Sequence, residues 1–179
     1  PNLLIHEADA DIRYYRDLAD ERPGGRGLKA FELSRPQIMP VASPAFLKIF
    51  SRIRHPGDLP QVRCLTYRRD REVITWKYID EAGEQQELNI QGVLSANNGE
   101  LLRLAAIGGM GVALLSEATV RNDLRDGTLV RLLPEYRFAV RAFSNGVFAV
   151  FRQSRALPLK VRAFVDYVAD ALRTEPPAK

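Results

Sequence analysis

Apolar residues recur along the chain at two different spacings, and each spacing predicts a different type of element. Near the C-terminus they lie at i, i+3, i+4, i+7, i+8 and i+11, which places them on one face of an α-helix. This stripe consists of Val161, Phe164, Val165, Val168, Ala169 and Leu172. Short runs of β-branched, aromatic and aliphatic residues predict strands instead. These runs are 10–14, 37–42, 64–67, 73–80, 88–94, 112–115 and 129–133.

Capping residues mark where the other predicted helices begin and end. Ser43 followed by Pro44 starts a helix over 45–50, because serine accepts a free backbone N–H and proline fits the first helical position. Ser116 caps another helix, which Gly127 ends. A third helix is predicted over 100–107, after a pair of asparagines.

The remaining segments complete the prediction of the fold. Residues 80–84 form a polar turn that joins 73–80 to 88–94 as a hairpin. Segment 137–143 alternates like a strand, so it either turns through 144–146 back onto 147–151 or forms an irregular loop. Strands that alternate with helices favour an α/β fold with a largely parallel sheet and one added antiparallel hairpin.

Composition narrows the class of protein. The 179 residues suffice for about one domain, or for two closely joined halves. A hydrophobic content of 46% with 27% charged residues excludes a disordered chain and a coiled coil. No run of about 18 apolar residues is present, so no membrane-spanning helix is predicted. The lone Cys64 excludes an intramolecular disulfide and a multi-cysteine metal site, and fits a reducing compartment.

The charge pattern and the ends of the chain say less about the class of protein than the composition does. The net charge is +4, but the arginines are scattered singly among acids, which favours a solvated surface over a nucleic-acid footprint. The only dense cluster, Arg68–Arg71, contains an aspartate. No signal peptide is visible. A start at Pro1 rather than at methionine suggests a piece of a longer chain.

Residues with catalytic chemistry are sparse, and no enzyme, metal site or cofactor is predicted. No Gly-x-Ser-x-Gly motif is present, and His6 and His55 have no metal-ligand spacing. Cys64 lies within a predicted strand and is interpreted as a small buried hydrophobic residue. The glycines of 108–111 follow a helix and precede a strand, which is the reverse of a phosphate-binding loop, so they predict a tight turn.

Polar residues stand between a strand and a helix at several places. Tyr14 follows a strand, and Ser43, Asn97 and Asn98 each lie between a strand and a helix. Ligands of open parallel α/β sheets bind at the carboxyl ends of strands, where helix N-termini favour an anion such as a carboxylate. Two interpretations remain open, because Ser43 and the asparagines either line a pocket together or serve only as helix caps.

The order of short motifs along the chain carries a family resemblance. In sequence they are ADIR at 10–13, PVASPAFL at 40–47, HPGDL at 55–59, RCLTY at 63–67, NNGE at 97–100, GGMGVALL at 108–115, DLRDGTLVRLLP at 123–134 and PLKVRAFVD at 158–166. Together they cover nearly the whole chain. Their order and spacing resemble the effector-binding (regulatory) domain of LysR-type bacterial transcription regulators.

The resemblance implies a fold and a division of the chain. The fold is α/β, with two Rossmann-like subdomains joined by two crossover strands, as in type 2 periplasmic binding proteins. The crossovers are expected at Met39–Ser43 and Phe148–Arg152. Subdomain I is then 1–41 plus 150–179, and subdomain II is 42–149. Relative to the family, the chain lacks the DNA-binding winged helix-turn-helix, and the first strand and first helix of the regulatory domain.

The resemblance also implies a function. The chain is expected to be a cytoplasmic sensor domain for transcription regulation, which binds a small-molecule effector such as a carboxylate and needs no cofactor. The cleft positions that match the family are Tyr14, Ser43, Thr66, Asn97 and Asn98, with Arg13 as a helper. Asn97 and Asn98 are expected to face Tyr14 across the cleft. A periplasmic-type solute-binding protein for transport is the alternative, and the residues upstream of Pro1 would discriminate between the two.

The family resemblance also implies that copies of the chain associate with one another. The family's regulatory domains pair side by side, so a homodimer or homotetramer is predicted, with the helices at 43–50 and after Ser116 as the contact. Their apolar residues are Phe46, Ile49, Phe50, Val120 and Leu124. The alternative is that these residues pack inward. DNA is expected to be bound only through the absent N-terminal domain, so residues 1–179 alone are predicted to show no sequence-specific binding.

Overall fold

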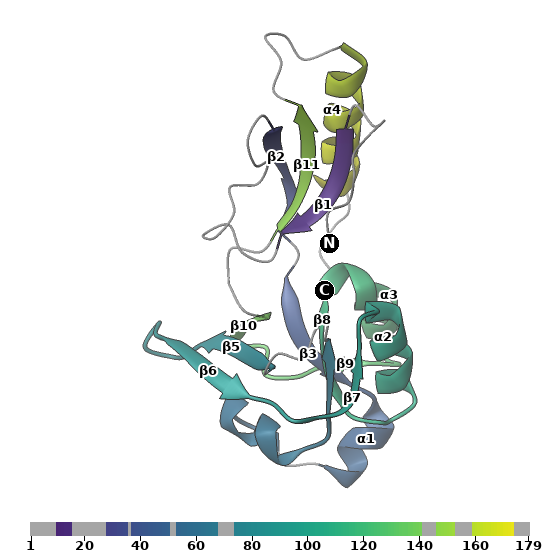
Figure 1. The fold of residues 1–179 in the computed structure, drawn as a ribbon. Coiled ribbons are helices and arrows are strands. Elements are labelled where there is room, and N and C mark those ends of the chain that lie inside the picture. The colour runs from purple at the N-terminus through teal and green to yellow at the C-terminus, as the bar shows by residue number, and fades with distance from the viewer. Residues whose placement is uncertain are drawn as a thin grey trace. The chain divides into compact units, whose positions relative to one another are not determined.

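The computed structural model describes residues 10–15, 28–35, 37–50, 53–67, 74–140, 146–152 and 159–173. The chain forms two compact units (Figure 1). Unit one combines Pro1–Pro36 with Ser144–Pro177, and unit two is formed by Gln37–Phe143. The chain thus passes between the units several residues before each of the boundaries predicted at 41 and 149. The assignment of the units to the family's two subdomains stays a prediction.

Unit one is a small antiparallel sheet with one helix. Its strands are β1 (Ala10–Tyr15), β2 (Leu28–Ser34) and β11 (Gly146–Arg152), with β11 in the centre and antiparallel to both neighbours. Helix α4 (Leu159–Arg173) contacts β2 (Figure 1). The predicted helical stripe supplies part of the core, which consists of Leu33, Ala149, Val161, Val165 and Ala169. Strand β2 was not predicted from the sequence.

Unit two is built on a larger mixed sheet with the strand order β6-β5-β10-β3-β8-β4-β7, and β9 pairs with β3. Its strands are β3 (Ile38–Ala42), β4 (Cys64–Tyr67), β5 (Thr75–Ile79), β6 (Gln85–Asn89), β7 (Gly92–Ala96), β8 (Val112–Ser116), β9 (Val130–Arg131) and β10 (Arg137–Val140). The segments predicted at 37–42, 64–67, 73–80 and 112–115 are confirmed as strands.

The expectation of a largely parallel sheet is wrong. Parallel pairing joins β4 to β7 and to β8, whereas the other pairs described in unit two are antiparallel. Helix α1 (Pro44–Ile49) follows β3 and precedes the 3-10 helix η1 (Pro56–Gln61) and β4. Because β3 is antiparallel to β8 and β4 is parallel to β8, strand β4 begins at the edge of the sheet where β3 ends, and the two strands run in opposite directions.

Three shorter segments also differ from prediction. The return strand of the hairpin begins at Gln85, and the predicted segment 88–94 divides between β6 and β7. The segment 129–133 yields only the two-residue β9. Strand β10 pairs with β5 and β3, so the hairpin considered between 137–143 and 147–151 is excluded. The expected crossover strands correspond to β3 and β11, each of which pairs within one unit.

Helices cover both faces of the sheet in unit two. Helices α2 (Gly99–Ile107) and α3 (Glu117–Asp126) pack on one face, over a core that includes Met39, Val41, Leu65, Leu102 and Val120 (Figure 1). Helix α1 and the 3-10 helix η1 (Pro56–Gln61) contribute Phe46 and Leu59 to the other core, around Trp76. His55 caps η1, because its Nδ1 accepts the Gly57 N–H at 3.0 Å.

Helices α1 and α3 turn most of the apolar residues expected at a dimer contact toward the interior. Phe46 and Val120 are fully buried, and Phe50 and Leu124 pack partly buried against the two cores. Of the five apolar residues in question, Ile49 is exposed. Four of the five residues thus pack inward, as the alternative has it, and contact of these helices with a second copy stays a prediction. An amphipathic sequence pattern cannot distinguish a partner's surface from the sheet beneath the helix.

Cys64 is buried as expected, and its Sγ donates to the Leu59 carbonyl at 3.3 Å. Burial raises the pKa of the thiol from 9.0 to about 12. The unfolded chain releases this proton above pH ~9 whereas the folded chain holds it to pH ~12, so this contribution to stability falls across that window. Between pH 8 and 10 the protein should lose about 1.4 kcal/mol more stability than its Cys64→Ala variant. Urea denaturation at both pH values tests this, and equal losses would contradict it.

Candidate functional site

One edge of the sheet in unit two gathers the carboxyl ends of three strands. Strand β4 is parallel to β7 and to β8, so their last residues Tyr67, Ala96 and Ser116 lie along the same edge. Asn97 and Asn98 follow β7 directly, and α2 begins at Gly99. This is the arrangement in which open α/β sheets bind ligands. We call Asn97, Asn98 and the first turn of α2 the effector edge.

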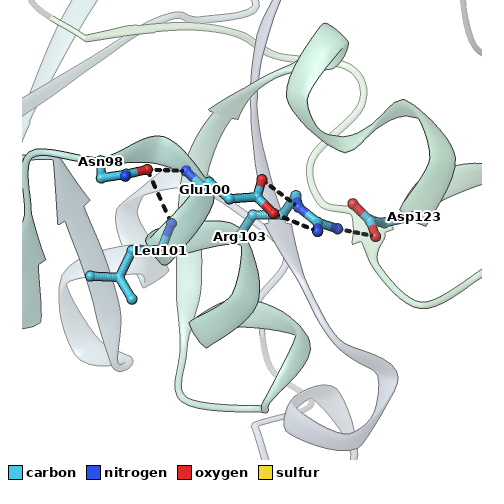
Figure 2. Close-up of polar contacts among 5 residues, drawn as sticks. All are labelled: Asn98, Glu100, Leu101, Arg103 and Asp123. Carbon is cyan, nitrogen blue, oxygen red and sulfur yellow. Dashed lines mark hydrogen bonds and ion pairs between the residues drawn. The ribbon is translucent and has the colours of Figure 1, made fainter.

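Asn98 is the N-cap of α2. Its Oδ1 accepts the backbone N–H groups of Glu100 at 2.8 Å and of Leu101 at 3.4 Å (Figure 2). These bonds satisfy two of the free N–H groups of the helix. The side-chain oxygen of Asn98 thus stabilises the helix, whereas its NH₂ group has no acceptor among the described residues and is left for a ligand. Asn97 is exposed and makes no hydrogen bond within the described part of the chain.

An arginine connects the start of α2 to α3. Nε and one terminal nitrogen of Arg103 bind the two carboxylate oxygens of Glu100 at 2.9 and 2.7 Å, and the other terminal nitrogen binds Asp123 Oδ1 at 2.6 Å (Figure 2). Hydrogen bonds from Arg103 lower the pKa of Glu100, and Glu100 and then Asp123 raise the pKa of Arg103. Arg103 therefore positions the first turn of α2 against α3.

The sequence did not predict this cluster. Glu100 and Arg103 are an i, i+3 pair, which is a visible signal for a local ion pair. Asp123 lies 20 residues further along the chain and is only 7% exposed. Its second oxygen, Oδ2, is buried without a hydrogen-bond partner among the described residues. Nothing in the sequence links this aspartate to Arg103, because the contact depends on how the two helices pack.

Thr66 is fully buried in β4. Its Oγ1 lies 2.8 Å from Ser95 Oγ and donates to the Leu94 carbonyl at 3.3 Å. A Cβ at Gly92 would lie 2.2 Å from this oxygen, so the neighbouring strand leaves Thr66 no free space there. The hydroxyl is satisfied inside the sheet. A ligand at the surface would meet Ser95, which is exposed and which the sequence analysis did not select.

The structure does not bring Ser43 to the effector edge. Strand β3 is antiparallel to β8, with Val41 opposite Ala113 and Ile38 opposite Ser116, so the carboxyl end of β3 lies at the opposite edge of the sheet. Ser43 is buried there, and its Oγ accepts the Phe46 N–H at 3.3 Å. The interpretation of Ser43 as a helix cap is therefore the one that the geometry supports.

Tyr14 belongs to unit one, where it lies opposite Val147 in the pairing of β1 with β11. Its side chain, like those of Arg13 and His6 and the Arg68–Arg71 cluster, lies outside the described part of the structure. The predicted cleft between Tyr14 and Asn97 therefore stays a prediction.

The described residues also bear on metal binding and on membrane insertion. No group of three or more His, Cys, Asp or Glu side chains within the described ranges is placed to hold a metal ion. None of the helices described has the length and apolar character needed to cross a membrane.

Comparison with known proteins gives a consistent result. Residues 5–173 match the model of the LysR substrate binding domain. The transcriptional regulator PtxR of Pseudomonas aeruginosa is 30% identical over 154 residues, which are 86% of this chain and 48% of PtxR. The transcriptional activator TtdR of Escherichia coli strain UTI89 is 33% identical over 169 residues, 94% of this chain and 51% of TtdR. The chain thus spans about half the length of these relatives.

Solved structures show the same fold. The regulatory domain of CrgA from Neisseria meningitidis has a TM-score of 0.70 at 28% identity, over 90% of this chain and 75% of that one. The regulatory domain of AphB from Vibrio vulnificus has a TM-score of 0.69 at 26% identity, with the same coverage. The expected α/β fold, like that of type 2 periplasmic binding proteins, is confirmed. The chain therefore belongs to the LysR family and is its substrate-binding domain, the regulatory domain that senses the effector.

Proposed function

We propose that the chain is the sensor of a bacterial transcription regulator that works in the cytoplasm and binds DNA through a module outside residues 1–179. The relatives are named as HTH-type transcriptional regulators rather than as enzymes, and the chain matches about half of their length. This favours the regulator over a solute-binding protein for transport. A bound effector would favour one arrangement of the chain over another and so shift a population of conformers.

The exposed amides of Asn97 and Asn98 at the start of α2 carry the proposal for the effector site. The Asn98 NH₂ group donates to the ligand while the carbonyl oxygen of the same side chain keeps the helix capped. The positive end of the helix dipole favours an anion, so small carboxylates are the first class of effector to test. Ser95 on β7 is exposed two residues before Asn97 and is a further hydroxyl for the ligand, whereas a contribution of Tyr14 stays a prediction.

Alanine variants separate capping from binding. Asn98→Ala should lower the free energy of unfolding by about 1 kcal/mol, because the cap of α2 is lost. Asn97→Ala should leave stability nearly unchanged, because its side chain is exposed and makes no bond in the described residues. Both substitutions should weaken the binding of the effector at least tenfold in isothermal titration calorimetry. The matched control is Asn122→Ala, an exposed asparagine of α3. An unchanged affinity in both Asn97→Ala and Asn98→Ala would contradict the site.

Exposed apolar side chains favour another surface for assembly. Leu101 and Leu104 on α2 are 49% and 52% exposed, and Val93 on the adjacent end strand β7 is 58% exposed. A two-fold pair of such patches buries apolar area on both copies. We therefore propose that α2 and β7, rather than α1 and α3, form the interface of the homodimer, or of the dimer within a homotetramer.

The variant Leu101→Glu/Leu104→Glu should be monomeric where the native chain is dimeric. Static light scattering at about 100 μM is the measurement, since an interface with a Kd of ~1 μM is mostly filled at that concentration. Leu159→Glu, on the strongly exposed start of α4, is the control and should remain dimeric. A monomeric native chain, or an unchanged mass for the double variant, would contradict this interface.

A further inference from the structure

Unit two contains a cavity that is separate from the effector edge. It has a volume of about 340 Å³ and lies between α3 and the strands β3 and β9. That volume is within the range of roughly 300–1,000 Å³ that is usual for small-molecule sites. Met39, Leu124 and Leu129 form its apolar part, and Gln37, Glu117 and Arg131 are polar residues on its wall. Neither Asn97 nor Asn98 lines it.

Arg131 has hydrogen-bonding capacity that the protein does not use. It lies on β9 opposite Val41, and one terminal nitrogen donates to the Pro134 carbonyl at 3.1 Å. Its Nε is buried and has no hydrogen-bond partner among the residues that the structure describes. Its guanidinium forms no ion pair with any carboxylate of the same residues. Because Nε is closed off from solvent, the N–H groups that a ligand in the cavity can reach are those of the terminal nitrogens.

The other charge on the wall of the cavity is already balanced. The Glu117 carboxylate lies 4.0 Å from Arg121 Nε, one helical turn along α3, and its backbone N–H donates to the Gln37 carbonyl at 2.8 Å. The cavity therefore offers one cation that forms no ion pair among the described residues. Leu129 and Met39 are almost fully buried, so the apolar surface that a ligand can cover comes from Leu124 and Val130. An arginine binds a carboxylate through two parallel N–H groups, and the two terminal nitrogens present such a pair.

We propose that this cavity is a second ligand site, for a small monocarboxylic acid with an apolar body. The carboxylate binds the terminal nitrogens of Arg131, and the carbon skeleton covers Leu124 and Val130. This site lies within unit two and does not depend on the effector edge.

Benzoate is a suitable probe, and benzamide is its uncharged control. Isothermal titration of the full chain should show saturable binding of benzoate and binding of benzamide at least tenfold weaker. Arg131→Met keeps the apolar stem of the side chain and removes its charge. The affinity for benzoate should fall at least tenfold, because a charge-assisted hydrogen bond is lost. The double variant Asn97→Ala/Asn98→Ala should bind benzoate as the native chain does.

Two additions keep the test decisive. If thermal denaturation shows that Arg131→Met does not fold, Arg131→Lys retains the charge, lacks the paired donors of the guanidinium and should still weaken benzoate binding several-fold. Backbone NMR signals of Leu129, Val130 and Arg131 should shift on titration. Failure of benzoate to saturate by about 10 mM, or unchanged binding in the Arg131 variant, would overturn the proposal. Loss of binding in the asparagine double variant would also overturn it, because benzoate would then occupy the effector edge.

Discussion

Replacing Trp76 by alanine is expected to lower the free energy of unfolding by about 3–5 kcal/mol. Trp76 is 1% exposed in β5, and its neighbours across the sheet are Leu88 on β6 and Val140 on β10. Truncation removes the largest fully buried side chain described and leaves a cavity, because the strands on both sides hold the surroundings in place. Urea denaturation followed by circular dichroism measures the loss.

Two controls accompany this variant. Trp76→Phe keeps most of the apolar volume and should cost clearly less than the alanine substitution. Val93→Ala truncates an exposed residue of β7 and should change stability by no more than about 0.5 kcal/mol. A loss below about 1 kcal/mol for Trp76→Ala would show that this core does not hold unit two together.

Replacing Gly111 by alanine should cost about 2–3 kcal/mol. A Cβ at this buried glycine would lie 2.4 Å from the Arg63 carbonyl oxygen, which is a backbone atom and has little freedom to move. The same oxygen accepts the Val112 N–H at 2.8 Å, and this bond joins the start of β8 to β4. The methyl group therefore forces the start of β8 away from the residue that precedes β4.

Gly99→Ala is the matched control, because a Cβ there would meet nothing within 4 Å. Gly99 is the first residue of α2, so alanine should leave stability equal or raise it slightly. The fluorescence of Trp76, the single tryptophan of the chain, reports the unfolding of unit two in both variants. Equal stability of Gly111→Ala and the native protein would contradict the close approach of Gly111 to Arg63.

Local signals in the sequence predict the helices of this fold well. Ser116 and Gly127 mark the two ends of α3, and Gly127 has the left-handed backbone, φ +77°, that suits a glycine after a helix. Strand β2 was missed because its pairing is not local. Its partner β11 lies more than 100 residues away, and Phe31 on β2 is exposed, so no clear alternation marks the strand.

The candidate site could be predicted only in part, for the same physical reason. Ser43 and Asn98 carry similar capping signals, since each follows a strand and precedes a helix. Strand direction decides which edge of the sheet each cap occupies. The antiparallel pairing of β3 with β8 places Ser43 at the edge opposite to Asn98, and no local pattern reports that pairing. The sequence likewise offers both asparagines as caps, and backbone geometry selects Asn98.

The most direct test of the account is an NMR titration of the ¹⁵N-labelled chain with a compound chosen by thermal-shift screening. Small carboxylates, aromatic acids and amino acids form the screen, because a ligand that binds only the folded chain raises its melting temperature. If Asn97 and Asn98 form the effector site, the backbone signals of Asn97, Asn98 and Gly99 shift and saturate with the concentration of the compound. A compound that stabilises the protein and saturates while these three signals stay unchanged would contradict it.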